Sequence, residues 1–186
     1  MSSESQTAEK PVSARDRIID VAGPLFYREG YRAIGVDRVI AEAGVAKATF
    51  YKYFPAKDDL IVAWVNRAEE RFVANLPPED GPLPLIVYAD QMIDIAGKVW
   101  CLGCTYQGTA AEFADPAHPA HAASMGVKRR VIDQLHIRAR NQGLPDPQAS
   151  AERVFLFLEG VWAATRMFGT SVPLTHAKDA IRRLIA

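Results

Sequence analysis

The first third of the chain carries apolar residues every three or four positions, which is the spacing of a helix that buries one face. The first such stripe predicts a helix over residues 13–29, and its members are Ile18, Ala22, Leu25 and Phe26. Ser13 and Asp16 resemble a capping box at the start of this helix, and Gly30 is a natural stop at its end. Pro24 removes one helical amide hydrogen bond, so we expect a kink there.

Two short helices are predicted next, over residues 36–43 and 47–53, and apolar residues again line one face of the first. Gly44 allows the sharp turn between them. Pro55 separates the second from a longer amphipathic helix, predicted over residues 57–76. Two short helices joined by a glycine turn and braced by a preceding helix are the parts of a helix-turn-helix.

Helical spacing also dominates the rest of the chain, beyond a break rich in proline and glycine at residues 77–84. Further helices are predicted over residues 85–100, 105–114, 121–141, 147–168 and 176–185. The sequence has no sustained alternation of apolar and polar residues and no hairpin turn signal. We therefore predict an all-α chain of about nine helices.

Composition narrows the class of protein without deciding its function. The 186 residues include 49% hydrophobic and 24% charged residues, which is typical of a globular chain. No apolar run approaches the roughly 18 residues that a membrane span requires. Residues 1–12 are polar, lack the apolar core of a signal peptide and predict a flexible arm. We expect a cytoplasmic protein.

The charge pattern favours a local polyanion-binding patch over a general one. Lysine and arginine total 22, and so do aspartate and glutamate, so the formal net charge is zero. Between Gly44 and Lys57, however, there are three lysines and no acidic residue. Lysines in such a patch can neutralise DNA phosphates.

The predicted helix over residues 47–53 carries the groups that would contact DNA. Its spacing buries Phe50 and Phe54. The residues left for DNA are Lys47, Thr49, Tyr51, Lys52 and Tyr53. Threonine and tyrosine hydroxyls can bond phosphates or base edges, and the threonine methyl can meet a thymine methyl.

The segment GYRAIGVDRVIAEAGVAKATFYKYFPAKDDLI resembles the N-terminal domain of the TetR family of bacterial transcriptional regulators, and the likeness covers residues 14–62. The resemblance implies DNA contacts from Val36, Asp37, Lys47, Ala48, Thr49, Tyr51, Tyr53 and Lys57. The chain departs from the commoner pattern at Gly35, where serine or threonine often caps the helix, and at Pro24. The first departure weakens a cap, and neither removes an expected contact.

The same resemblance implies a helix-turn-helix domain over residues 13–58 and a helical effector-binding and dimerisation domain over residues 59–186. The expected protein is a repressor that binds a palindromic operator as a homodimer and is released by a small-molecule effector. The two recognition helices of such a dimer would lie about 34–36 Å apart.

Two sets of residues in the C-terminal domain are candidates for these roles. Residues 154–168 carry only Glu159 and Arg166 as charged members, and their small residues suit either self-association or a monomeric core. An effector pocket needs apolar walls with a few polar anchors. The candidates for its lining are Trp64, Met92, Trp100, Tyr106, Gln107, Phe113, Phe155, Trp162 and Met167.

A metal-sensing or redox-sensing regulator is an alternative within the same class. Four residues offer soft or borderline zinc ligands, namely Cys101, Cys104, His118 and His121. A lone Cys-x-x-Cys pair also occurs in redox switches. The main prediction includes no metal and no other cofactor, because the histidine spacing is shorter than that of common zinc fingers.

An enzyme and a protein-binding adaptor are the alternatives from other classes. Candidate acids and bases are Glu112, His118, His121 and His136. No nucleophile motif, phosphate loop or cofactor fingerprint accompanies them, so we interpret them as loop and surface residues. A helical adaptor would use its C-terminal face to bind another protein without DNA.

Overall fold

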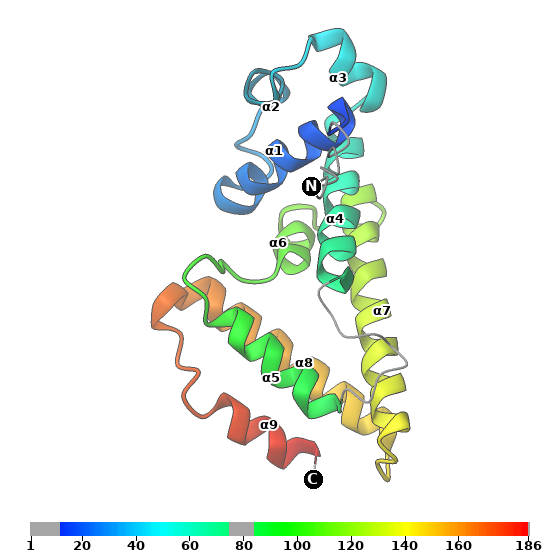
Figure 1. Ribbon diagram of the computed structural model, residues 1–186, viewed down its shortest axis with the longest axis vertical. Coiled ribbons are helices and arrows are strands. Elements are labelled where there is room, and N and C mark those ends of the chain that lie inside the picture. The colour runs from blue at the N-terminus through cyan, green and yellow to red at the C-terminus, as the bar shows by residue number, and fades with distance from the viewer. Residues whose placement is uncertain (1–11, 75–83, 186) are drawn as a thin grey trace, which may run out of the picture.

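The computed structural model describes residues 12–74 and 84–185, and the regular elements within these ranges are all helical (Figure 1). They are α1 (Ala14–Glu29), α2 (Val36–Ala43), α3 (Lys47–Tyr53), α4 (Lys57–Ala74), α5 (Leu85–Ala96), α6 (Thr105–Glu112), α7 (Pro119–Asn141), α8 (Pro147–Phe168), the 3-10 turn η1 (Gly169–Ser171) and α9 (Ala177–Ile185). The all-α prediction is confirmed over these ranges. The predicted arm lies outside the described residues except for Val12, and so do the last two residues of the helix predicted over 57–76.

Local signals set most helix ends where they were predicted. The Ser13 hydroxyl accepts a hydrogen bond from the backbone N–H of Asp16 at 3.1 Å and so caps α1. The helix then continues through Pro24 to Glu29. Gly44 follows α2 in the left-handed conformation, with φ 60°, which a side chain would disfavour.

Three predicted helices differ by two or more residues at one end, and one of them is the helix predicted over residues 105–114, which stops at Glu112. The helix predicted over residues 85–100 stops at Ala96, where the N–H of Gly97 donates to the carbonyl of Ile93. Val99 and Trp100 beyond it are 82% and 65% exposed, so no packing would stabilise a further helical turn. The helix predicted from residue 121 begins earlier, at Pro119, which suits a first helical position.

The helices pack around two apolar cores. The N-terminal core joins α1, α2, α3, the first half of α4 and the start of α7, and consists of Ile18, Ile19, Ala22, Phe26, Tyr31, Ile34, Val39, Ala43, Phe50, Phe54, Leu60, Ile61 and Ala120. The C-terminal core joins α5, α7, α8 and α9, and consists of Leu85, Tyr88, Ala89, Met92, Ile93, Ala96, Leu135, Ala139, Ala151, Val154, Leu158, Val161, Ala177 and Ile181. Burial of these side chains is the main favourable contribution to folding.

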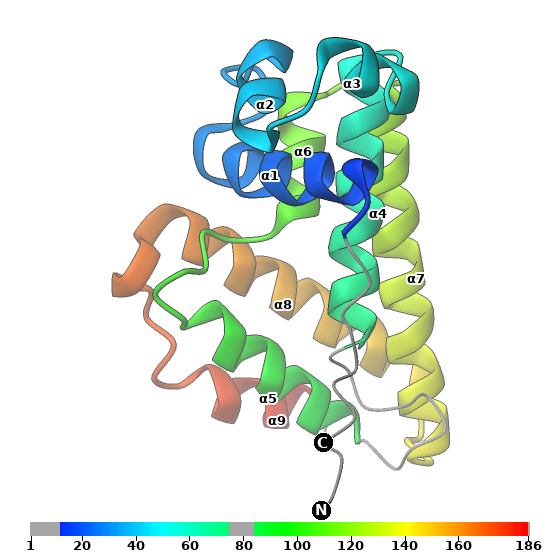
Figure 2. The same cartoon turned by 45° about the horizontal axis from the view of Figure 1, so that its top comes forward.

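Helices α4 and α7 run side by side and connect the two cores (Figures 1 and 2). Helix α6 lies beside them, between α1 and the layer that contains α5 and α8. The end carrying α2 and α3 therefore projects away from the layer formed by α5, α8 and α9. None of the helices in the described ranges is long and apolar enough to cross a membrane.

Helix α4 is held against α1 by one close contact and by ion pairs. Gly23 of α1 faces the ring of Trp64 so closely that an added Cβ would overlap it. Arg67 pairs with Asp16 of α1, and Arg71 pairs with Asp20 at 2.5 Å. The glycine at position 23 thus has a packing role, because only a residue without a side chain lets α1 lie against the indole.

Candidate nucleic-acid interface

Two aromatic residues anchor α3 and fix which of its faces points outward. Phe50 and Phe54 are 0% and 1% exposed, and their ring centroids lie 5.8 Å apart in the N-terminal core. The N–H of Phe54 donates to the carbonyl of Phe50 and ends the helix. A helix of seven residues is marginal alone, so these two buried rings determine its position.

The opposite face of α3 is open and carries the predicted contact residues. Lys47, Ala48 and Lys52 are exposed, while Thr49 is half-buried. Tyr51 and Tyr53 are 44% and 37% exposed, which is high for large aromatic residues. The face combines cations, hydroxyls and one small side chain, a set that fits phosphates and base edges in a DNA groove.

The start of α2 lies beside the start of α3. Asp37 is exposed, and its carboxylate pairs with the Lys47 ammonium at 3.3 Å. Val36 is half-buried, and Gly35 before it provides no side-chain cap. The structure therefore brings Val36 and Asp37 next to the exposed face of α3, in the arrangement of a helix-turn-helix.

Lys57 differs from the other two lysines of this patch. Its ammonium donates to the backbone carbonyl of Tyr31 at 2.5 Å, and the side chain is half-buried. Burial lowers the pKa of Lys57 below its usual value. Lys57 thus joins the start of α4 to the turn after α1, whereas Lys47 and Lys52 reach into solvent.

Glu112, at the end of α6, holds the same turn from the other side. Its carboxylate accepts hydrogen bonds from the backbone N–H of Tyr31 at 2.9 Å and of Arg32 at 3.1 Å. The Tyr31 hydroxyl in turn bonds the Thr109 hydroxyl of α6 at 2.6 Å. This role of Glu112 was missed from the sequence, because its partners lie about eighty positions away and no local pattern connects them.

A second contact joins α1 to the segment before α6. The Tyr27 hydroxyl donates to the carbonyl of Gly103 at 2.8 Å and accepts from the N–H of Leu102 at 2.7 Å. The Leu102 carbonyl also accepts from the Arg166 guanidinium of α8 at 3.2 Å. Burial raises the pKa of the Tyr27 hydroxyl, so it stays a neutral donor. The residues from Cys101 to Glu112 thus contact α1 or the turn after it at both ends.

The four zinc-ligand candidates do not form a metal site. Cys101 and Cys104 are buried free thiols, and Cys101 lies 3.9 Å from the Tyr27 hydroxyl. His118 accepts from the N–H of Ala120 to cap α7, and His121 bonds the carbonyl of Phe113 at 2.7 Å. Nowhere in residues 12–74 and 84–185 do three metal-ligating side chains gather. The described residues therefore give the zinc alternative no support, because Nδ1 of His118 and Nδ1 of His121 each have a structural partner.

The predicted pocket residues do not line one site. Trp64 packs on Gly23, and Phe113 stacks on His118 with ring centroids 4.3 Å apart. Trp100 and Met167 are 65% and 78% exposed. Met92 is buried in the C-terminal core, and Phe155 and Trp162 are partly buried against that core.

Three of the predicted pocket residues do gather around one ion pair. Lys128 of α7 pairs with Glu159 of α8, and its ammonium lies 5.8 Å from the ring centroids of both Tyr106 and Phe155. The Gln107 amide donates to the Glu159 carboxylate at 2.8 Å. The contact between α6, α7 and α8 therefore combines aromatic side chains with polar and charged groups.

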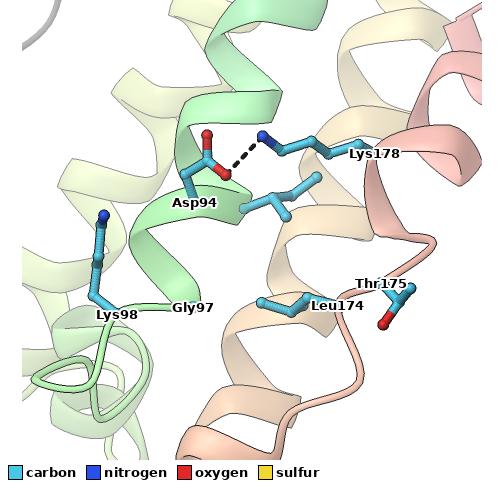
Figure 3. A pocket seen from close by; sticks show the side chains of 7 residues that line it. Asp94, Gly97, Lys98, Leu174, Thr175 and Lys178 are labelled. Carbon is cyan, nitrogen blue, oxygen red and sulfur yellow. Dashed lines mark ion pairs between the residues drawn. The ribbon is translucent and has the colours of Figure 1, made fainter.

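A separate cavity of about 470 Å³ lies between the end of α5 and the segment leading into α9 (Figure 3). Its lining consists of Ile93, Asp94, Gly97, Lys98, Leu174, Thr175 and Lys178. Asp94 and Lys178 pair across it at 2.6 Å and neutralise each other. None of the predicted pocket residues lines this cavity.

Comparison with known proteins agrees with this geometry. Residues 18–64 match the family model described as bacterial regulatory proteins, tetR family. The chain is 30% identical over 161 residues to the HTH-type transcriptional repressor KstR of Rhodococcus jostii, covering 85% of this chain and 72% of that protein. It also resembles the solved structure of SCO4454, a TetR-family transcriptional regulator from Streptomyces coelicolor, with 30% identity, a TM-score of 0.78 and coverage of 92% and 95%. A putative TetR transcriptional regulator from Streptomyces avermitilis gives 31% identity, a TM-score of 0.74 and coverage of 92% and 99%.

Proposed function

Because the chain belongs to the TetR family and is therefore a DNA-binding transcriptional regulator, we propose that it is a repressor that binds a palindromic operator as a homodimer and is released by a small-molecule effector. It would act in the cytoplasm, where bacterial DNA lies. The family consists of regulators rather than enzymes, so Glu112, His118 and His121 are assigned the structural roles described above.

One observation carries the DNA-binding proposal. Phe50 of α3 and Phe54 just after it are buried, whereas the lysines and tyrosines of α3 are exposed and Thr49 is half-buried. Exposing two tyrosines to water has no benefit for folding, whereas in a major groove they can contact base edges and phosphates. We propose that the contacts come from Val36, Asp37, Lys47, Ala48, Thr49, Tyr51 and Tyr53. Lys57 would contribute mainly by fixing the turn at Tyr31.

The proposed dimer interface is one face of α8. Leu156, Gly160, Ala163 and Met167 are spaced four, three and four residues apart and are all exposed. Leu156 and Met167 are 68% and 78% exposed, and an added Cβ at Gly160 would meet nothing within 4 Å. This spacing places the four side chains in one stripe. An apolar stripe of this kind on a helix favours burial against a second copy.

Release by an effector requires a connection between the two domains, and the segment before and including α6 supplies one. It contacts Tyr27 through Leu102 and Gly103, and the turn after α1 through Glu112. An effector that binds best when this segment is displaced would move α1, and with it α3. The operator affinity would then fall.

Selection of bound fragments from random double-stranded DNA by the full chain tests this proposal. We expect an inverted repeat whose half-sites lie about one helical turn apart, and a mass of two chains per operator by light scattering. Binding of a single half-site by a monomer with full affinity would contradict the dimer. Failure to enrich any sequence would contradict specific DNA binding.

A further inference from the structure

Arg138 of α7 is a buried cation without a counter-ion among the residues that the structure describes. The residue is 4% exposed, and its Nε and Nη1 groups have no hydrogen-bond partner in the described part of the chain. The guanidinium lies 5.4 Å from the ring centroid of Tyr88, on α5. The aromatic face offers some attraction, but it accepts no conventional hydrogen bond in place of those that the buried N–H groups lost on leaving water.

The charges near Arg138 do not compensate it. Burial raises the pKa of the Tyr88 hydroxyl, and so does the negative charge of Glu159, which pairs with Lys128. Glu69, farther along the same interior, pairs with Arg130 at 2.5 Å. Each of these pairs is neutral, and Asp90 of α5, whose Oδ1 is buried without a hydrogen-bond partner among the described residues, pairs with Arg182 of α9. Arg138 itself has no ion-pair partner among the described residues, so it is an unpaired buried positive charge. Such a charge is costly unless an anion joins it.

The surroundings of Arg138 are apolar, and α5 and α7 make few direct contacts with each other. Its neighbours Leu135 and Ala139 on α7 and its partner Tyr88 on α5 all belong to the C-terminal core. The direct contact between α5 and α7 is small compared with that between α7 and α8. A ligand that separates α5 from α7 would therefore disrupt few existing contacts.

We propose that Arg138 is the anchor for the effector, and that the effector is a monoanion, such as a carboxylate, attached to an apolar body. This inference rests on the proposed function, because it assigns a chemical class to the effector. The carboxylate accepts charge-assisted hydrogen bonds from the N–H groups of the guanidinium that have no partner among the described residues. The apolar body lies between α5 and α7, against Tyr88 and the C-terminal core.

Calorimetric titration of the DNA-free full chain tests the charge preference. The probes are straight-chain carboxylates from butanoate to dodecanoate and 1-naphthoate, each compared with the alcohol of the same carbon skeleton. We expect at least one carboxylate to bind about ten- to a hundredfold more tightly than its alcohol. Equal affinities for each pair, or no binding by any carboxylate, would overturn the proposal.

Two arginine variants show whether Arg138 is responsible. Arg138→Met keeps the length of the side chain and removes its charge, so the preference for carboxylate over alcohol should vanish. Arg130→Met, on the same helix, is the matched control and should retain the preference, because Arg130 already pairs with Glu69. Preference retained in Arg138→Met would overturn the assignment.

The melting temperature of each variant separates an anchor from a structural residue. Removal of an unpaired buried charge should leave the melting temperature of Arg138→Met unchanged or raise it, whereas a large drop would indicate a structural role and contradict the proposal. Arg138→Lys keeps the charge without the planar fork and should show an intermediate preference. Operator binding by the unsubstituted chain is measured in a separate experiment. If that chain binds no operator, the proposed function is contradicted, whereas the carboxylate titration still tests the role of Arg138.

Discussion

Replacement of Gly23 by alanine tests the packing of α1 on α4. In a helix, alanine is favoured over glycine by about 1 kcal/mol, so the change would stabilise an unobstructed position. At position 23 the new methyl group would overlap the Trp64 ring, and a bulky ring cannot move aside as a flexible chain end can. Overpacking of this kind costs about 1–3 kcal/mol, so the net effect should range from neutral to about 2 kcal/mol of destabilisation.

Gly126 of α7 provides the matched control, because an added Cβ there would meet only the end of the Arg130 side chain, at 3.5 Å. Gly126→Ala should therefore stabilise the chain by about 1 kcal/mol. Urea unfolding of both variants at one protein concentration measures the difference, which isolates the overpacking term of about 1–3 kcal/mol. The cost of Gly23→Ala should disappear when Trp64 is leucine, as a double-mutant cycle would detect. Equal stabilisation by both alanines would refute the close approach.

Three further changes test the DNA-binding face, the junction and the dimer. Lys47→Ala should weaken operator binding and reduce the slope of log affinity against log salt by about 1. Lys98→Ala, far from α3, is the control and should change neither quantity. Equal slopes for Lys47→Ala and the unsubstituted chain would exclude a phosphate contact at Lys47. Glu112→Gln should lower the free energy of unfolding measured in urea by about 1 kcal/mol, because the hydrogen bonds from the turn at Tyr31 would then reach a neutral acceptor. An unchanged free energy would show that the charge of Glu112 contributes nothing to stability. Met167→Asp should give a monomer in light scattering with the helical signal retained, and a dimer that persists would place the interface elsewhere.

The helix-turn-helix was predictable from sequence because its signals are local. The cap at Ser13, the left-handed turn at Gly44 and the alternation of buried and exposed residues around Phe50 each act within a few positions. The end of α5 was not predictable in this way. Helical spacing alone extends the predicted helix over Gly97 to residue 100, whereas the exposure of Val99 shows that no packing supports the last turn.

The effector site was harder to predict because aromatic residues serve core and pocket alike. Trp64 and Phe113 were chosen as pocket residues for their size, yet both pack at the junction with α1 or the turn after it. Arg138 was not chosen, since an arginine in a helix is normally exposed. Only the three-dimensional arrangement shows that its guanidinium is buried over Tyr88, with Nε and Nη1 unpartnered among residues 12–74 and 84–185.

The contacts of α6 bear on how the proposed release would work. Tyr27 and Tyr31 lie four positions apart and are held by opposite ends of the segment from Cys101 to Glu112. Two attachment points restrict rotation as well as translation of α1, so a shift of this segment would tilt the whole N-terminal core rather than loosen a single helix. Phe50 and Phe54 tie α3 to that core, and α3 would move with it as a rigid body. In the proposed dimer, even a small tilt on each side would change the separation of the two recognition helices, to which a palindromic operator is sensitive.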